Sequence, residues 1–249
     1  MRLKILQKNW HQLGREDPLF AVLTVKDKRG GKWDEEKFFE TGRREIKETL
    51  NQLKDSKVKL VYGTALDFGC GVGRLTQALA DYFQEVHGVD IAPSMIEKAK
   101  KYNTKSRNCF YHLNETDDLK IFPDANFDFV LSKITLQHME PNYAKKYIKE
   151  FFRVLKSGGI AVFQIPEKRI TPAVQNDSTK QRIKNLIPEP ALALYRRLTP
   201  NARPLIEMYG IPREEIKTLV REGGGEIIDV KEDKSAEKWT SFEYLVRNV

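Results

Sequence analysis

Between residues 63 and 166 the chain alternates short β-like runs with amphipathic helical stretches, and this alternation constrains the possible folds most strongly. Strands separated by helices in this way form βαβ units, with helices on both faces of a parallel sheet. We therefore predict a doubly wound α/β fold. The expected strands are residues 64–69, 85–90, 109–114, 127–132 and 159–165, followed by 225–232 and 241–248.

The rest of the chain supplies additions to this α/β unit. A helix is expected to begin at Asp34, a good N-cap residue, and its apolar stripe must pack on another element. That stripe consists of Phe39, Ile46, Leu50 and Leu53. We expect residues 1–55 to form a helical N-terminal cap on a main domain at 56–249. Within that domain the basic, proline-punctuated stretch 167–211 is expected to be a helical insert that forms a substrate lid.

Composition limits the function classes only broadly. The 249 residues carry a net charge of +8, which suits a lysine-rich surface and also leaves nucleic acid open as a partner. The two cysteines, Cys70 and Cys109, are not at zinc spacing, so we predict no metal and a reducing compartment. No stretch resembles a signal peptide or a membrane helix, and we expect a cytoplasmic protein without a membrane partner.

The stretch ALDFGCGVGR, residues 65–74, places Gly69, Gly71 and Gly73 directly after the first strand. A strand that enters a glycine turn and then a helix exposes backbone N–H groups at the carboxyl edge of the sheet, where a ligand can approach closely. Asp90 ends the second strand about 20 residues later, where an acid can bind the hydroxyl groups of a ribose. These features together predict a nucleotide-type ligand.

Two nucleotide ligands fit this pattern to different degrees. A dinucleotide fold requires G-x-G-x-x-G, but here the glycines alternate and Arg74 stands at the third position. Asp67 also lies within the turn, where it would repel a pyrophosphate and suit an ammonium group. The pattern therefore favours S-adenosylmethionine (SAM) over NAD.

At these residues the sequence resembles the class I SAM-dependent methyltransferases of the standalone small-molecule or glycan type. Five stretches follow the order of that family, and they are LDFGCGVGR, VHGVDIAPSMIEKAK, NETDDL, FPDANFDFVLSKITLQHM and FFRVLKSGGIAVFQIP. The resemblance implies a seven-stranded, mostly parallel sheet with an antiparallel last strand. It also implies SAM as the cofactor, with S-adenosylhomocysteine as the product.

The resemblance further implies roles for individual residues at the SAM site. Asp67 would organise the loop and the amino group, Asp90 would bind the ribose, and Asn114, Glu115 and Thr116 would meet the adenine edge. The remaining implied cofactor-binding residues are Gly69, Cys70, Gly71, Arg74, Ile91, Met95, Ser132 and Lys133. Lys133 departs from the small or polar residues usual after the fourth strand.

The acceptor side is less constrained by the sequence. Methyl transfer from a sulfonium depends mainly on holding the nucleophile at attack distance, but a hydroxyl acceptor would profit from a general base. His138, which follows the fourth strand, is the candidate catalytic base. Phe39 and Arg43 of the cap helix and Tyr195, Met208 and Tyr209 of the insert are candidate substrate or lid residues.

Three functions remain open at this point. The leading prediction is methyl transfer to a small-molecule or glycan acceptor, at oxygen. An RNA methyltransferase that uses the basic insert is the second, and a SAM-binding protein without turnover is the third.

Overall fold

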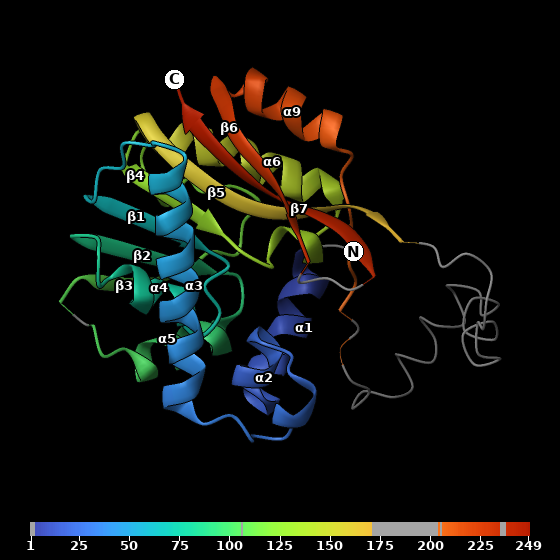
Figure 1. Ribbon diagram of the computed structural model, residues 1–249. Helices are drawn as coiled ribbons and strands as arrows, with labels where there is room; N and C mark the ends of the chain where they lie inside the picture. Colours follow the sequence, from blue (N-terminus) through green and yellow to red (C-terminus); the bar gives the residue numbers. More distant parts are fainter. Residues whose placement is uncertain (1–2, 106, 171–203, 205, 235–237) are drawn as a thin grey trace, which may run out of the picture.

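A seven-stranded sheet with the order β3-β2-β1-β4-β5-β7-β6 forms the centre of the molecule (Figure 1). The computed structural model describes residues 3–105, 107–170, 204, 206–234 and 238–249. The strands are β1 (Thr64–Phe68), β2 (Glu85–Asp90), β3 (Cys109–Leu113), β4 (Phe127–Ser132), β5 (Leu155–Arg169), β6 (Gly225–Asp233) and β7 (Trp239–Asn248). All seven strands predicted from the sequence are therefore confirmed.

The direction of each strand follows the doubly wound pattern. Strands β1 to β5 pair in parallel, whereas β7 runs antiparallel between β5 and β6. The sheet order reverses between β1 and β4, and in such sheets ligands bind outside the carboxyl ends of the strands at this point. The expected mostly parallel sheet with an antiparallel last strand is confirmed.

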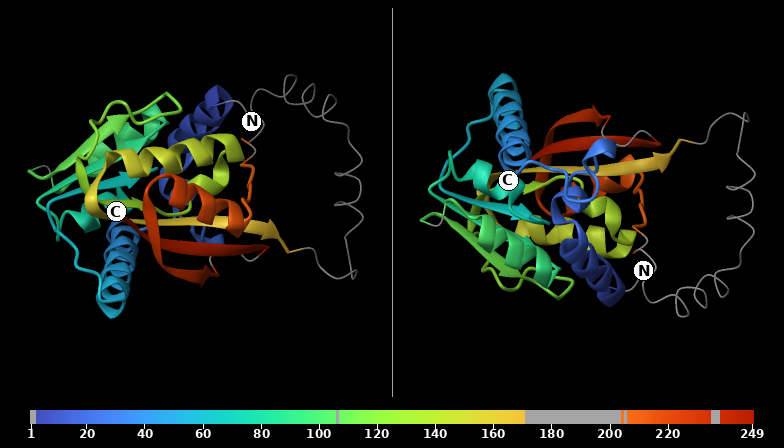
Figure 2. Two further views of the ribbon diagram at one scale, coloured as in Figure 1. Left: turned by 90° about the horizontal axis from the view of Figure 1, so that it is seen from above. Right: turned by 90° about the horizontal axis from the view of Figure 1, so that it is seen from below.

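Helices cover both faces of the sheet, as Figure 2 shows from above and below. They are α1 (Leu3–Glu16), α2 (Pro18–Val22), α3 (Glu35–Asp55), α4 (Arg74–Leu79), α5 (Pro93–Tyr102), α6 (Pro141–Val154) and α9 (Arg213–Glu222), with 3-10 turns η1 (Lys26–Lys28) and η2 (Leu136–His138). Apolar residues of α3, α4 and α5 share one core, and those of α6 and α9 share the core on the other face. Within the described residues, no helix is both long and apolar enough to cross a membrane.

Helix α3 begins where the sequence predicts, because the Asp34 side chain accepts a hydrogen bond from the Lys37 backbone N–H (2.9 Å). The predicted stripe is shifted at one position. Phe38 is the fully buried aromatic residue, whereas Phe39 is only half-buried and packs on Tyr102. Most of α3 packs on α4, while Phe38 near its start packs with Leu19 of α2 and Met95 of α5.

The transition from α6 into β5 also differs in detail from the prediction. The sequence predicts that the stretch SGG at 157–159 stops the helix, but α6 already ends at Val154 and β5 begins at once. Gly158 lies within the irregular first part of β5 with a φ of 76°. The glycine turn therefore lies within the first part of β5 and does not end α6.

Helices α1 and α2 lie at the carboxyl edge of the sheet (Figure 1). Helix α1 is tied to α5, since Ser94 donates to His11 both from its backbone N–H (to Nδ1, 3.1 Å) and from its hydroxyl (to the carbonyl, 2.7 Å). Leu6 inserts into the core on the α6 face. This N-terminal segment thus forms a cover over the edge where the sheet order reverses.

Candidate functional site

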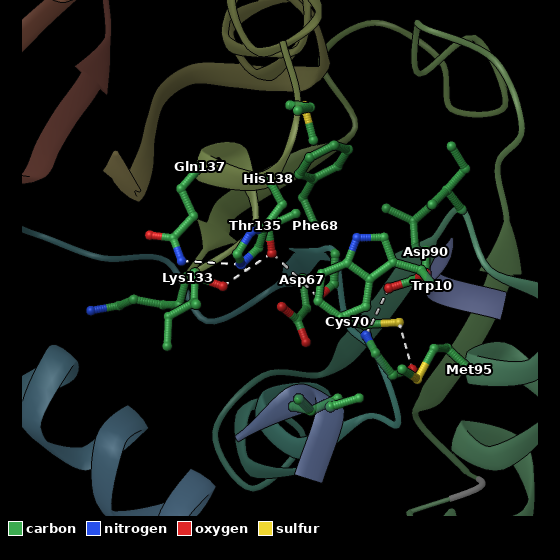
Figure 3. A pocket seen from close by; sticks show the side chains of 18 of the residues that line it. Trp10, Asp67, Phe68, Cys70, Asp90, Met95, Lys133, Thr135, Gln137 and His138 are labelled. Carbon is green, nitrogen blue, oxygen red and sulfur yellow. Dashed lines mark hydrogen bonds between the residues drawn. The ribbon is translucent and has the colours of Figure 1, made fainter. Parts of the chain in front are cut away.

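A cavity of about 500 Å³ opens at the carboxyl ends of β1, β2 and β4, beneath α1 and α2 (Figure 3). Its volume is within the range of small-molecule and cofactor sites, roughly 300–1,000 Å³. Backbone of the loop after β1, carboxylates from β1 and β2, and apolar side chains from α1 line it. The site is built from segments that are distant in the sequence and that meet only in the folded sheet.

The glycine loop forms the floor of this cavity. Gly69 has a φ of 78°, and a Cβ there would lie 2.2 Å from Thr135 Cγ2. A Cβ on Gly71, which has a φ of 52°, would lie 2.6 Å from Val22 Cγ2 of α2. Both positions therefore need glycine for the backbone angle and for the space.

Asp90 closes the loop from the side of β2. Its carboxylate accepts hydrogen bonds from the backbone N–H groups of Gly71 (3.0 Å) and Ala92 (2.8 Å). Burial raises the pKa of Asp90 to about 6, although the hydrogen bonds from Ala92 and Gly71 oppose this shift. A carboxylate at the strand end, beside the glycine backbone, is the acceptor expected for ribose hydroxyl groups.

Asp67 is a second buried carboxyl group on the cavity wall. It accepts a hydrogen bond from the Thr76 hydroxyl (2.7 Å), and burial raises its pKa to about 7. A cationic ligand nearby would favour the charged form and oppose this shift. The two carboxylates on the cavity wall are hydrogen-bond acceptors and therefore suit a ligand with both an ammonium group and ribose hydroxyls.

The loop after β4 supplies the wall opposite Asp90. Ile134 adopts a φ of 56°, an unusual value for a β-branched residue, and the Thr135 hydroxyl donates to the Lys133 carbonyl (3.0 Å). Lys133 lines the cavity, but its ammonium group pairs with Glu243 of β7 and extends away from Asp67 and Asp90 (Figure 3). Ile134 and Thr135 of this loop also line the cavity.

His138 lies on the same wall, with its ring against Trp10 at a centroid distance of 5.3 Å. Its Nδ1 is 3.1 Å from the Glu207 carbonyl and its Nε2 is 3.1 Å from Gln137 Nε2. Burial lowers the pKa of His138 to about 4, so the ring is neutral near pH 7. Both ring nitrogens are engaged in the protein, an arrangement that disfavours the general base predicted from the sequence.

Twelve of the residues predicted for the site line the cavity. They are Asp67, Gly69, Cys70, Gly71, Arg74, Asp90, Ile91, Met95, Asn114, Lys133, His138 and Met208. The Arg74 guanidinium is held in an ion pair with Glu45 of α3 (2.8 Å), which draws its charge toward that helix.

Three predicted SAM-site residues do not line the cavity. Glu115 is hydrogen-bonded to Gln7 of α1, and the Thr116 hydroxyl is turned into its own loop, where it donates to Asn114 Oδ1 (2.9 Å). Ser132 is fully buried in β4. Of the predicted adenine-edge residues, only Asn114 therefore lines the cavity.

The predicted lid residues are also placed mostly outside the cavity. Phe39 packs on Tyr102, and Arg43 pairs with Glu40 (2.6 Å) on the exposed side of α3. Tyr209 lies beside the cavity and donates from its backbone N–H to the Gln137 carbonyl (2.8 Å). Tyr195 lies outside the described residues.

The cover that the structure does describe comes from α1 and α2, which the sequence reasoning did not assign to the site. Leu3, Leu6 and Trp10 of α1 and residues 21–24 line the cavity. The spacing of these three α1 residues is that of one helix face, and this was the signal available in the sequence. Thr135, Gln137 and Tyr147 are further lining residues that no motif singled out.

The sheet order, the glycine loop and the carboxylate at the end of β2 together define a Rossmann-like fold with a site suited to a nucleoside ligand. Residues 66–163 match the family described as "Methyltransferase domain", and the chain accordingly carries such a domain.

Curated relatives match over a similar length of the chain. A 2-methyl-6-phytyl-1,4-hydroquinone methyltransferase from Synechocystis is 37% identical over 100 residues, which cover 40% of this chain and 30% of that protein. A demethylmenaquinone methyltransferase from Tropheryma whipplei is 30% identical over 110 residues, which cover 43% of this chain and 44% of that protein. The chain thus spans less than half the length of these relatives.

The solved structures extend the similarity of fold to nearly the whole chain. Magnesium protoporphyrin IX methyltransferase from Synechocystis, with bound S-adenosylhomocysteine, aligns with a TM-score of 0.63 over 99% of both chains at 15% sequence identity. At this identity the match concerns the fold alone.

Proposed function

We propose that this protein is a SAM-dependent methyltransferase that acts on a small-molecule acceptor. The observation that carries the proposal is the crevice at Gly69 and Gly71, where a Cβ would have no room, beside the buried carboxylate of Asp90. A backbone floor next to a ribose-binding acid suits a nucleoside held close to the main chain.

The residues around this crevice would divide the binding of SAM between them. Asp90 would accept the ribose hydroxyls, while Ile91, Met95 and Asn114 would form the adenine site. The Asp67 carboxylate and the Gly69 carbonyl would accept the ammonium group of the methionine part. Each of these groups lines the cavity.

When bound, SAM would supply a methyl group attached to a positively charged sulfonium sulfur. The sulfur is the leaving group, and it needs no further activation. The chain would contribute positioning and the exclusion of water, since Leu3, Leu6 and Trp10 close one side of the cavity. The neutral ring of His138 would line the cavity and would not act as a base, because both of its ring nitrogens are already hydrogen-bonded within the protein.

The acceptor is proposed to be a small, largely apolar molecule. Two observations support this: apolar side chains dominate the cover of the cavity, and the two relatives are named for 2-methyl-6-phytyl-1,4-hydroquinone and demethylmenaquinone. Transfer to an oxygen, a glycan acceptor and an RNA acceptor are the other possibilities raised by the sequence. The residues 171–203, which hold most of the basic insert, lie outside the described residues.

The direct test is to incubate the protein with methyl-labelled SAM and separated fractions of host metabolites, RNA and protein. We expect label in the apolar small-molecule fraction. Label in the RNA fraction would show that RNA is the acceptor and would contradict the small-molecule proposal. SAM binding without label in any fraction would favour a binding protein without turnover.

SAM binding should weaken as the pH falls through about 6. Burial raises the pKa of Asp90, so below pH 6 its carboxyl group is protonated and loses acceptor capacity, whereas ribose hydroxyls favour the carboxylate. Binding should therefore release protons near pH 6, and the Kd should rise by up to about fourfold between pH 7.5 and 5.5, the most that one group with a pKa of about 6 can contribute. Calorimetry in buffers of different ionisation enthalpy measures both effects, and proton uptake would contradict this assignment of Asp90.

Replacing Trp10 by alanine should raise the Kd for SAM about tenfold, because removing a large aromatic side chain from the cover costs on the order of 1–2 kcal/mol of contact energy. Tyr62→Ala is the matched control, since Tyr62 packs on Phe83 just before β1 begins, away from the cavity. Calorimetric titration with SAM measures both variants. Equal affinity of Trp10→Ala and wild type would show that α1 does not cover the ligand.

A further inference from the structure

A series of hydrogen-bonded polar side chains runs along the wall of the cavity from β5 to the segment 206–211. Gln164 of β5 accepts a hydrogen bond from the Ile134 backbone N–H at its Oε1 (3.1 Å) and donates from Nε2 to Gln137 Oε1 (3.2 Å) and to Ser241 Oγ (2.5 Å). Gln137 Nε2 reaches His138 Nε2 (3.1 Å), and His138 Nδ1 reaches the Glu207 carbonyl (3.1 Å). Gln164 and Gln137 are both buried.

The groups at the two ends of this hydrogen-bonded series determine the direction of every hydrogen bond within it. The Ile134 N–H can only donate, so the oxygen of Gln164 faces it and the amide nitrogen of Gln164 faces Gln137. Gln137 must then turn its own NH₂ group toward His138, whose Nε2 accepts. At the other end the Glu207 carbonyl can only accept, so His138 carries its proton on Nδ1. The assignments from the two ends agree.

The same contacts hold two segments against the cavity. Gln164 binds the backbone N–H of Ile134, which has the unusual φ of 56° in the loop after β4. His138 binds the Glu207 carbonyl, and the Gln137 carbonyl accepts from the Tyr209 N–H (2.8 Å). Ile206 and Met208, which line the cavity, belong to the segment fixed in this way.

We propose that Gln164 is a positioning residue: through Gln137 it sets the tautomer and orientation of His138, and so holds the segment 206–211 against the acceptor side of the cavity. This inference rests on the proposed methyltransferase function only for its effect on turnover. Gln164 itself is not among the residues that line the cavity, and the hydrogen bonds described for Asp67 and Asp90 go to other groups. Its loss should therefore affect turnover and leave SAM binding intact.

The full-length protein with ¹⁵N-labelled histidine provides the test. The chain has four histidines, so replacing each of the other three in turn identifies the NMR signals of His138 by elimination. In the wild type at pH 7 we expect a neutral ring with the proton on Nδ1. In Gln164→Met the Gln137 amide is free to turn and only the Glu207 carbonyl still favours Nδ1–H, so a minor Nε2–H population should appear. The kcat with labelled SAM should fall about tenfold to a hundredfold, and the Kd for S-adenosylhomocysteine should stay within about twofold.

Gln164→Glu tests the direction of these hydrogen bonds as well as the packing of the side chain. The ionised carboxylate that this substitution introduces can only accept, so Gln137 must reverse and its oxygen must face His138. The proton should then move to Nε2, and the hydrogen bond from Nδ1 to the Glu207 carbonyl should be lost. Protonation of the new carboxyl group at lower pH restores one donor and should return the proton to Nδ1. The charged groups around this position are Asp233, which accepts from Ser241, and the ion pair of Lys133 with Glu243, the β7 residue opposite Gln164.

Gln77→Met is the matched control, because it removes another buried glutamine amide, in α4, that accepts from Thr104 and takes no part in this hydrogen-bonded series. It should leave the His138 tautomer unchanged. An Nε2–H or charged His138 in the wild type, or an unchanged tautomer in both Gln164 variants, would overturn the inference. If the wild type transfers no label, the proposed function fails, while the His138 spectra still decide the role of Gln164.

Discussion

Replacing Asp90 by asparagine should weaken SAM binding by about a hundredfold. The carboxylate accepts from the backbone N–H groups of Gly71 and Ala92, and it is the proposed acceptor for the ribose hydroxyls. Asparagine has nearly the same shape but only one acceptor oxygen, so its NH₂ group must face a donor. The loss of charge-assisted hydrogen bonds, about 1.5–3 kcal/mol, corresponds to a factor of roughly 10–150 in Kd.

Asp128→Asn separates this effect from a general loss of stability. Asp128, near the start of β4, also accepts from a backbone N–H, that of Thr64 (2.8 Å), and it pairs with Lys156 (2.8 Å). It does not line the cavity. Calorimetric titration with SAM should give wild-type affinity for Asp128→Asn, with a lower melting temperature. Similar losses of affinity in both variants would contradict the assignment of Asp90 to the ribose.

The parts of the site that the sequence predicted depend on local chemistry. Strand β1, the loop from Gly69 to Gly73 and Asp90 at the end of β2 follow one another within 27 residues, and each has a recognisable residue type. A buried parallel strand is a nearly continuous apolar run, and its end at a glycine turn marks the carboxyl edge of the sheet. The position of the cavity therefore follows from the sequence alone.

The parts that the sequence did not predict depend on contacts between distant segments. The motif places Lys133 beside the cavity, but its ammonium group forms an ion pair with Glu243, 110 residues further along the chain. The environment of His138 is likewise set by Trp10, Gln164 and Glu207. A motif places such a residue at the edge of the sheet, but only the folded chain determines which partner neutralises it or fixes its tautomer.

The cover of the site shows the same limit on a larger scale. Helices α1 and α3 both carry an apolar face, and the aromatic residues of α3 favour that helix as the lid when the sequence is read alone. In the structure α3 is needed along the sheet, where Ile46, Leu50 and Leu53 complete the core with α4 and α5. Helix α1 is therefore the one that remains to close the carboxyl edge.

Gly69→Ala should abolish measurable SAM binding, and Gly158→Ala should not. Both glycines have positive φ values, 78° and 76°, so an alanine at either position costs a similar backbone strain of about 1–2 kcal/mol. A Cβ on Gly158 meets nothing within 4 Å, whereas a Cβ on Gly69 lies 2.2 Å from Thr135 Cγ2 and 2.3 Å from its Oγ1. The difference between the two variants therefore isolates the steric effect in the crevice.

The clash at Gly69 can be relieved only by moving the glycine loop or Thr135, whose hydroxyl is held by the Lys133 carbonyl. Either movement changes the space proposed for the methionine part of SAM. Thermal unfolding should show comparable losses from strain in the two variants and an added loss in Gly69→Ala, and calorimetry should show SAM binding only for Gly158→Ala. Adding Thr135→Gly to Gly69→Ala should restore part of the binding. If Gly69→Ala bound SAM as tightly as Gly158→Ala does, the bare backbone after β1 would not be the floor of the site, and the proposed function would lose its main support.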